Sequence, residues 1–216
     1  QRFDVVEGQE IQTLHTQSIG RYNVSNLLGV VGCLRALGIP LAQAVQSCAN
    51  LLQVPGRMEC QGGADAPLVV VDYAHTPDAL DKALEALKPV AQSRGGALWC
   101  VFGCGGDRDV RKRPMMAAIA ERHAEHVVVT SDNPRSEAPQ AIIDDILKGF
   151  AYAKAAAVQP DRAAAIRDSV LRAHVQDVVL VAGKGHEPYQ EIAGVRHAFS
   201  DMSQVQQALA ARGVRS

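Results

Sequence analysis

The 216-residue sequence has few aromatic residues, almost no net charge and no long apolar run. Aromatic side chains make up 4% of it, and its formal net charge is −1. Nucleic-acid-binding proteins use basic patches and stacked aromatic rings, so a nucleic acid partner is not expected. No stretch approaches the roughly 18 consecutive apolar residues of a membrane-spanning helix, and no signal peptide is recognisable. We therefore expect no membrane partner either.

The cysteines are odd in number and lack paired spacing. None of the five belongs to a Cys-x-x-Cys motif, and Cys100 and Cys104 lie in apolar surroundings, where a free thiol acts as a small hydrophobe. Disulfides and a zinc site are not expected, and a reducing cytoplasm fits best. The first residue is Gln1 rather than Met, and the chain opens in mid-pattern. This suggests a fragment of a longer protein.

Two common nucleotide-binding signatures are incomplete. In Gly103 to Arg108, an arginine occupies the place of the third glycine of a dinucleotide fingerprint. Around Gly183 to His186, both the upstream glycine and the Ser or Thr of a phosphate-binding loop are missing. A nicotinamide-dependent oxidoreductase is therefore disfavoured, and no phosphate-cradling loop of that kind is expected.

What is present, from Leu68 onward, is an alternation of apolar strands and helices. Strands are expected at 68–73, 97–102, 127–130, 155–158 and 178–182, helices at 77–91, 112–124, 139–150, 161–174 and 202–211, and a hairpin at 189–192 and 195–199. Continuous apolar strands between helices predict an α/β fold with a doubly wound parallel sheet of about five or six strands.

The first part of the chain has a different pattern. It predicts paired strands at 2–6 and 10–15, a helix from about residue 23 to 37 that ends at Gly38, and a second helix at 41–52. The stretch from Val54 to Pro67 is rich in turn formers. We therefore place a domain boundary near residue 61.

Four strand-end loops carry polar residues, and a parallel sheet brings such loops to one edge. They contain Asp72 and His75, then Arg108, then Asp132-Asn133-Pro134-Arg135, and finally Gly183 to Glu187. An Asp can hold an ammonium and an Arg can grip a carboxylate, so the third loop suits the charged end of an amino acid. The alternative is an ordinary turn that opens a helix.

Other polar residues of these segments have a simpler interpretation. In the first loop, Asp72 and His75 could contact a ribose, a phosphate or a metal ion, or Thr76 and Asp78 could merely cap the next helix. Arg111, Lys112 and Arg113 are expected to form a solvated first turn of helix, and His123 and His126 are expected to be surface and strand-end residues rather than a metal pair.

Several motifs occur in the order found in a known family. They are Gly20-Arg21-Tyr22-Asn23-Val24-Ser25-Asn26, Pro55-Gly56-Arg57-Met58-Glu59, Val71 to Pro77, Gly103 to Pro114, Asp132 to Arg135 and Gly183 to Glu187. With them the chain resembles, over essentially its whole length, the Mur ligases of peptidoglycan synthesis, in particular members that add diaminopimelate. The resemblance implies the last part of the central ATPase domain at 1–61. It implies the Rossmann-like, amino-acid-binding C-terminal domain at 62–216.

The resemblance further implies an amide-forming reaction. ATP, with Mg²⁺, phosphorylates the D-glutamate carboxylate of UDP-N-acetylmuramoyl-L-alanyl-D-glutamate, and the amine of meso-diaminopimelate attacks the acyl phosphate. The family's P-loop and its carbamylated lysine, which helps to hold magnesium, lie upstream of this chain. The fragment is therefore expected to be inactive alone, and we expect a monomer.

Site residues follow from the same resemblance. Contacts to meso-diaminopimelate are implied for Arg108, Asp132, Asn133, Pro134, Arg135, Gly183 and Glu187, and contacts to ATP for Asn23, Asn26, Arg57, Asp72 and His75. No residue of this chain is expected to bind the metal. A lysine-adding Mur ligase or a folylpolyglutamate synthase is disfavoured by Asp132 to Arg135, and a non-catalytic amino-acid-binding module remains an alternative.

Overall fold

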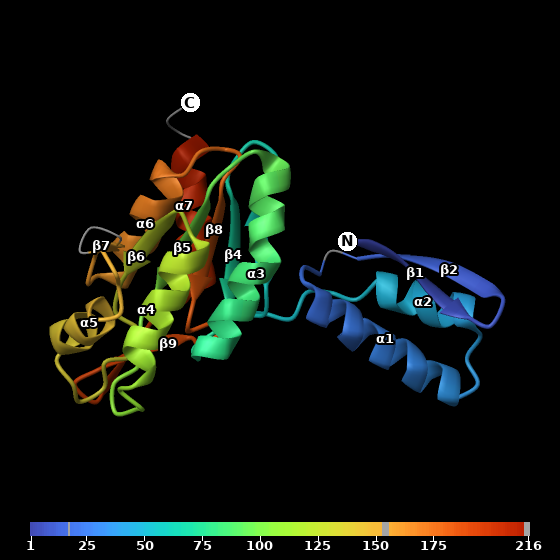
Figure 1. The fold of residues 1–216 in the computed structure, drawn as a ribbon, viewed down its shortest axis with the longest axis horizontal. Helices are drawn as coiled ribbons and strands as arrows, with labels where there is room; N and C mark the ends of the chain where they lie inside the picture. Colours follow the sequence, from blue (N-terminus) through green and yellow to red (C-terminus); the bar gives the residue numbers. More distant parts are fainter. Residues whose placement is uncertain (17, 153–155, 214–216) are drawn as a thin grey trace. The chain divides into compact units, whose positions relative to one another are not determined.

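The chain folds into two compact units, Gln1–Val54 and Pro55–Ser216 (Figure 1). The structure is a computed structural model that describes residues 1–16, 18–152 and 156–213. Each unit has a hydrophobic core of its own. None of the described helices is long and apolar enough to cross a bilayer.

The first unit is an antiparallel hairpin packed on two helices. The hairpin joins β1 (Arg2–Glu7) and β2 (Glu10–His15), and the helices are α1 (Arg21–Ala36) and α2 (Leu41–Ala49). Leu27 and Val31 are the buried residues of α1, at helical spacing. As predicted, α1 ends before Gly38, whose φ of +85° is readily adopted by glycine.

The second unit contains a six-stranded sheet in the order β3-β4-β8-β5-β6-β7. Its strands are β3 (Glu59–Gly62), β4 (Leu68–Asp72), β5 (Leu98–Phe102), β6 (His126–Val129), β7 (Ala156–Val158) and β8 (Val178–Ala182). Strands β4 to β8 pair in parallel, and β3 alone pairs antiparallel at the edge. The expected doubly wound, mostly parallel sheet is confirmed.

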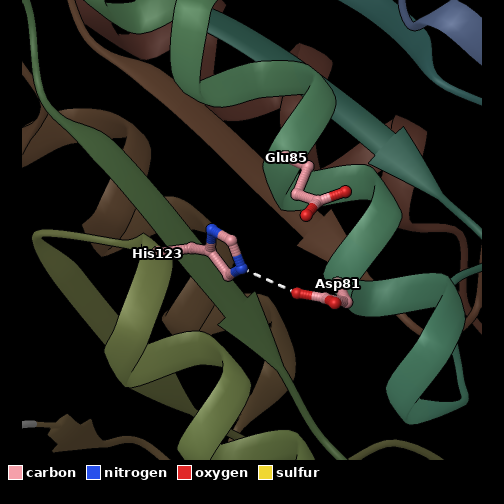
Figure 2. Close-up of side chains that lie close together, drawn as sticks. All are labelled: Asp81, Glu85 and His123. Carbon is pink, nitrogen blue, oxygen red and sulfur yellow. Dashed lines mark hydrogen bonds and ion pairs between the residues drawn. The ribbon is translucent and has the colours of Figure 1, made fainter.

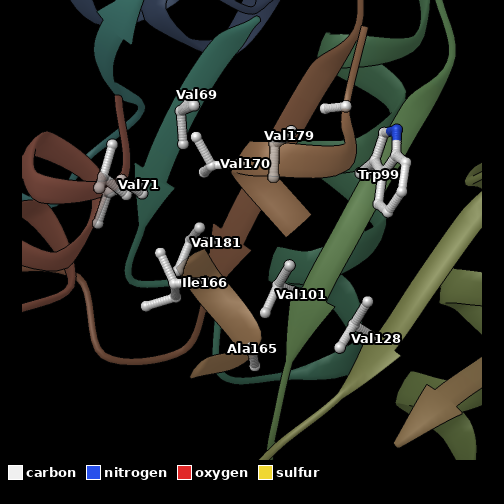
Figure 3. Packing of buried hydrophobic residues seen from close by; sticks show 13 residues of the cluster. Val69, Val71, Trp99, Val101, Val128, Ala165, Ile166, Val170, Val179 and Val181 are labelled. Carbon is white, nitrogen blue, oxygen red and sulfur yellow. The ribbon is translucent and has the colours of Figure 1, made fainter. Parts of the chain in front are cut away.

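Helices cover both faces of this sheet (Figure 1). One face carries α3 (Pro77–Arg94), α4 (Lys112–His123) and α5 (Pro139–Leu147), and the other carries α6 (Arg162–Arg172) and α7 (Asp201–Gly213). Valines at alternate positions, such as Val69 and Val71, join the cluster under α6 and α7 (Figure 3). The residues between them face the other helices, which explains strands that are apolar throughout.

Several expected boundaries can be compared with the structure, and α2, for example, ends at Ala49 rather than at residue 52. The stretch that is rich in turn formers contains β3, which pairs with β4, and the two compact units divide after Val54; the domain boundary near residue 61 stays a prediction. Helix α5 ends at Leu147 rather than at 150, and Gly149 beyond it packs so closely on Pro114 that a Cβ there would lie 2.0 Å from the Pro114 carbonyl oxygen. Of the strand expected at 155–158, residues 156–158 are confirmed, and Ala155 lies outside the described residues.

The four polar loops lie at the carboxyl edge of the sheet, as expected for parallel strands. The predicted hairpin is present as β9 (Tyr189–Ile192) and β10 (Val195–Ala198), a separate two-stranded sheet. It lies beside the loop after β6, where Arg135 forms a bridge with Ile192.

Candidate functional site

A cleft of about 380 Å³ opens where these loops meet. Its lining consists of Tyr73, His75, Thr76, Gly105, Arg108, Asp109, Lys112, Asp132, Asn133, Arg135, Gly183 and Glu187. Every residue predicted to contact the amino acid is among them except Pro134, which is buried in the turn. The structure thus brings together residues from three loops that are far apart in the sequence.

Asp132 is the buried acid of this cleft. It is 7% exposed, and within the described part of the chain its carboxylate accepts no hydrogen bond and forms no ion pair. Gly183 lies against it with φ +117°, and a Cβ there would be 2.5 Å from Asp132 Oδ2. Burial raises the pKa of Asp132, although Arg162 and Lys184 oppose the shift. The carboxylate is therefore an acceptor that can be satisfied by a cationic ligand group.

Glu187 is held by two neighbours through one of its oxygens. Its Oε2 accepts hydrogen bonds from Lys184 Nζ at 3.0 Å and from Asn133 Nδ2 at 2.8 Å. Lys184 Nζ also donates to Asn133 Oδ1 at 3.0 Å. Oε1 accepts no hydrogen bond from the described residues, which leaves it available to a ligand.

Lys184 was not predicted as a site residue, because the sequence showed it only as part of an incomplete phosphate-binding motif. Its side chain is 0% exposed and lies between two residues predicted to bind the amino acid. An ammonium without solvent needs such partners. The only sequence signal was a lysine enclosed by Gly183 and Gly185 directly after a buried strand.

Arg135 adopts a left-handed backbone conformation, with φ +53°, which is unusual for a residue with a side chain. The hairpin fixes it there: Arg135 N donates to the Glu191 carbonyl at 3.0 Å, and Ala193 N donates to the Arg135 carbonyl at 2.7 Å. Its guanidinium donates to the Gly106 carbonyl at 2.8 Å. The side chain predicted to grip a carboxylate is therefore positioned before any ligand binds.

The loop after β5 is tied to the same segment. Asp107 accepts hydrogen bonds from the Ser136 hydroxyl at 2.6 Å and from Ser136 N at 3.2 Å. The hydrogen bond from Ser136 lowers the pKa of Asp107. These contacts hold the loop that carries Arg108 against the loop that carries Arg135.

Arg113 corrects the expectation of a solvated first helical turn. It is 1% exposed, because it lies on the inner face of α4 with Met116, Ala117 and Ala120. Its guanidinium binds Glu137 at 2.8 Å and Asp145 at 2.9 Å. Lys112 lines the cleft instead of only facing solvent.

The residues predicted to bind ATP are divided between the units. Asn23 and Asn26 are neighbours on α1, where Asn26 Nδ2 donates to Asn23 Oδ1 at 3.3 Å. Arg57, Asp72 and His75 belong to the second unit.

In that unit the three residues gather around Tyr73, which sequence reasoning did not single out. The Arg57 guanidinium lies 4.9 Å from the centre of the Tyr73 ring. His75 Nδ1 is 2.8 Å from the Tyr73 carbonyl oxygen, and His75 lines the cleft. Asp72 is buried, which raises its pKa, and it accepts a hydrogen bond from Met58 N at 2.8 Å. Thr76 both caps α3 and lines the cleft.

Away from the cleft, Asp81, Glu85 and His123 point toward one another between α3 and α4 (Figure 2). Asp81 Oδ1 lies 2.7 Å from His123 Nε2 and 2.6 Å from Arg122 Nη2. Burial raises the pKa of Asp81, but these hydrogen bonds outweigh it, and the pKa lies below its usual value. A carboxylate oxygen already shared by a guanidinium and an imidazole of α4 ties the helices together, and we assign the group to helix packing.

Comparison with known proteins gives the family. The family model described as Mur ligase, glutamate ligase domain, matches residues 56–185, more than half of the chain. The chain belongs to the Mur ligase family. Within it, a relative from Acidovorax sp. (strain JS42) is 61% identical over 97% of this chain and 42% of its own length. A relative from Pseudomonas aeruginosa is 59% identical over 92% of this chain and 40% of its own length.

Both relatives are named UDP-N-acetylmuramoyl-L-alanyl-D-glutamate–2,6-diaminopimelate ligase. A solved structure of the same description is 41% identical with a TM-score of 0.74, over 98% of this Mur ligase chain and 43% of the other. A folylpolyglutamate synthase from Thermotoga maritima, 22% identical with a TM-score of 0.62 over 84% of this chain and 40% of its own, shares the fold. The chain thus spans about two fifths of the relatives that it matches.

Proposed function

We propose that this chain is the amino-acid-binding part of a ligase that adds meso-diaminopimelate to UDP-N-acetylmuramoyl-L-alanyl-D-glutamate. The observation that carries the proposal is the charge arrangement of the cleft. The buried carboxylate of Asp132, which accepts no hydrogen bond from the described residues, lines the cleft together with the guanidinium groups of Arg108 and Arg135. This arrangement complements an ammonium and a carboxylate on one carbon atom. The five free cysteines suit a reducing cytoplasm.

Binding one end of diaminopimelate leaves its other end free to react. Asp132 and the open Oε1 of Glu187 accept hydrogen bonds from the distal ammonium. The arginines bind the distal carboxylate in a planar, bidentate manner. Lys184 already holds Glu187, the hairpin holds Arg135, and Ser136 ties down the loop that carries Arg108, so little freedom is lost there on binding. The cleft thereby orients the reacting amine toward the substrate's activated carboxylate.

For the nucleotide, we propose contacts from Asn23, Asn26, Arg57, Asp72 and His75. The exposed Arg57 guanidinium, backed by the Tyr73 ring, and the exposed His75 offer donors suited to an anionic ligand. ATP with Mg²⁺ supplies the phosphoryl group that activates the D-glutamate carboxylate. This chain's own task is to hold the attacking amino acid.

The cleft should discriminate strongly against lysine. Lysine lacks the distal carboxylate, so its binding would leave the guanidinium groups of Arg108 and Arg135 without an anion in a partly desolvated cleft. Sites built around such a polar partner reject the analogue by about 10⁴-fold or more. This separates the proposal from a lysine-adding ligase on the same fold.

A chimera tests the function. In the Acidovorax relative, this chain replaces the matching segment, and amide formation is followed with ATP, the UDP-linked dipeptide and either amino acid. We expect turnover with diaminopimelate and a kcat/KM for lysine lower by about 10⁴-fold. Arg135→Ala should raise the KM for diaminopimelate at least about tenfold, while Arg167→Ala, an exposed arginine of α6, should not. Similar kcat/KM values for the two amino acids would refute the proposal.

A non-catalytic amino-acid-binding module is the second candidate, because a single unit supplies the whole cleft lining. Calorimetric titration of the 216-residue chain with diaminopimelate distinguishes the two. Tight binding without ATP would favour the module. We expect weak binding, because in a ligase of this kind the UDP-linked substrate and the nucleotide complete the site.

A further inference from the structure

A fully buried ion pair lies beneath the cleft, outside its lining. Arg162 and Asp201 are the first residues of α6 and α7, and both side chains are 0% exposed. The guanidinium binds the carboxylate in a bidentate manner, with Nε to Oδ1 and Nη2 to Oδ2 both at 2.7 Å. The pair fixes the plane of the guanidinium.

The same guanidinium binds the backbone at the ends of two strands. Arg162 Nη1 donates to the Ser131 carbonyl at 3.3 Å, and Nη2 donates to the Ala182 carbonyl at 3.0 Å. These carbonyls directly precede Asp132 and Gly183, which face one another in the cleft. Strands β6 and β8 are not neighbours, because β5 lies between them. Arg162 therefore spans the end of β5 and joins the two walls of the cleft.

A contribution to folding stability does not by itself explain why a buried ion pair occupies this position. Buried ion pairs are often no more stabilising than apolar residues of similar volume. A cation in the first turn of a helix is also unfavourable to the helix dipole, and Arg162 occupies that position in α6. Sequences break such local rules mainly at functional sites.

We propose that Arg162 is a positioning residue that sets the separation of Asp132 and Gly183, and with it the width of the amino-acid cleft. Asp201 acts with it by holding the guanidinium in plane. The inference rests on the proposed function. A lysine cannot replace Arg162, because one ammonium lacks the planar fork that reaches two carbonyls and both carboxylate oxygens.

The chimera described above, carrying Arg162→Lys, tests this role. We expect the KM for diaminopimelate to rise about tenfold or more, with kcat within about threefold and an unchanged KM for ATP. Arg212→Lys is the matched control, because Arg212 also binds backbone carbonyls, at Val170, Leu171 and Ala173 at the far end of α6. Arg212→Lys should lower the free energy of unfolding without changing the KM for diaminopimelate or for ATP. A KM for diaminopimelate within twofold of the parent would overturn the proposal.

A second measurement separates this inference from the proposed function. In the 216-residue chain, hydrogen exchange should accelerate at the amides of 131–135 and 183–187 in Arg162→Lys, and not in Arg212→Lys. Unchanged exchange there overturns the positioning role even if the chimera is active. If the parent chimera shows no activity with diaminopimelate, the proposed function is refuted. The hydrogen-exchange rates of the 216-residue chain still test the role of Arg162. Asp201→Asn repeats the test, because the amide keeps one acceptor but removes the charge and sets a donor against Arg162 Nη2, so the guanidinium is no longer held in plane.

Discussion

The Lys184 ammonium lies 3.0 Å from Glu187 Oε2, with the lysine side chain wholly buried and the glutamate 21% exposed. This salt bridge differs from a surface pair, because the buried ammonium cannot be hydrated if its partner is removed and would be left as an uncompensated charge. Glu187 and Asn133 thus depend on a residue that does not itself line the cleft.

Lys184→Met should therefore reduce both stability and binding. Removing one partner of a buried pair typically costs about 3 kcal/mol. The free energy of unfolding can be followed by the fluorescence of Trp99, the sequence's single tryptophan. Binding of diaminopimelate should weaken because Glu187 is no longer held.

Lys88→Met is the control. Lys88 donates to the His123 carbonyl at 2.8 Å and pairs with Glu125, but both lysine and glutamate are partly exposed. Its loss should change the unfolding free energy by less than about 1 kcal/mol. Equal effects of the two substitutions would contradict the role assigned to Lys184.

Asp132→Asn should stabilise the fold while weakening the binding of diaminopimelate. Because the folded-state pKa of Asp132 is raised, its contribution to stability is present at pH values below the unfolded pKa and is lost as the pH rises through the folded one. The asparagine variant should gain about 1 kcal/mol at neutral pH. The gain should disappear toward pH of about 4, the unperturbed range of aspartate. Urea unfolding across this pH range measures it, and a variant that is less stable at neutral pH would contradict the prediction.

Gly183→Ala should push Gly183 and Asp132 apart and thereby weaken the binding of diaminopimelate. The added Cβ would meet Asp132 Oδ2 at 2.5 Å, in a backbone with φ +117°. Gly63→Ala is matched in backbone, with φ +112°, but its Cβ would meet only Leu68 and Arg94 at 3.8 and 4.0 Å. Both variants should lose about 1–2 kcal/mol of stability from the backbone strain. Calorimetry should show weaker diaminopimelate binding in Gly183→Ala alone.

Residues 55–216 should fold and bind ligand without the first unit. The second unit has its own core and contributes the entire lining of the cleft. We expect the unfolding midpoint reported by Trp99 and the Kd for diaminopimelate to match those of the 216-residue chain. A truncated chain that does not fold would show that the two units depend on one another.

The parallel part of the sheet was predictable because its signal is local. Strands such as β8, Val178–Ala182, are apolar at every position, since both faces are covered by helices. Glycines and polar residues at the strand ends marked the loops, and the topology then placed them at one edge. The grouping of Asp132 with Gly183 and Glu187 followed from that placement together with the family resemblance.

The missed features depend on contacts between distant segments. The pairs Lys184–Asn133 and Arg162–Asp201 are separated by 51 and 39 residues, and neither cation differs locally from a surface residue. Strand β3 was missed because Glu59–Gly62 is short and lacks β-branched residues, so its pairing with β4 is a tertiary effect. The hairpin was predicted, but its contacts with Arg135 were not, for the same reason.

The strand order also constrains how this protein can be made. Strand β8 lies between β4 and β5, yet it comes from Val178–Ala182, long after both have been synthesised. On the ribosome, the apolar strands β4 and β5 therefore each keep an unpaired edge until β8, their shared neighbour, emerges. A message truncated before that point would yield a chain prone to aggregation, not a smaller working domain.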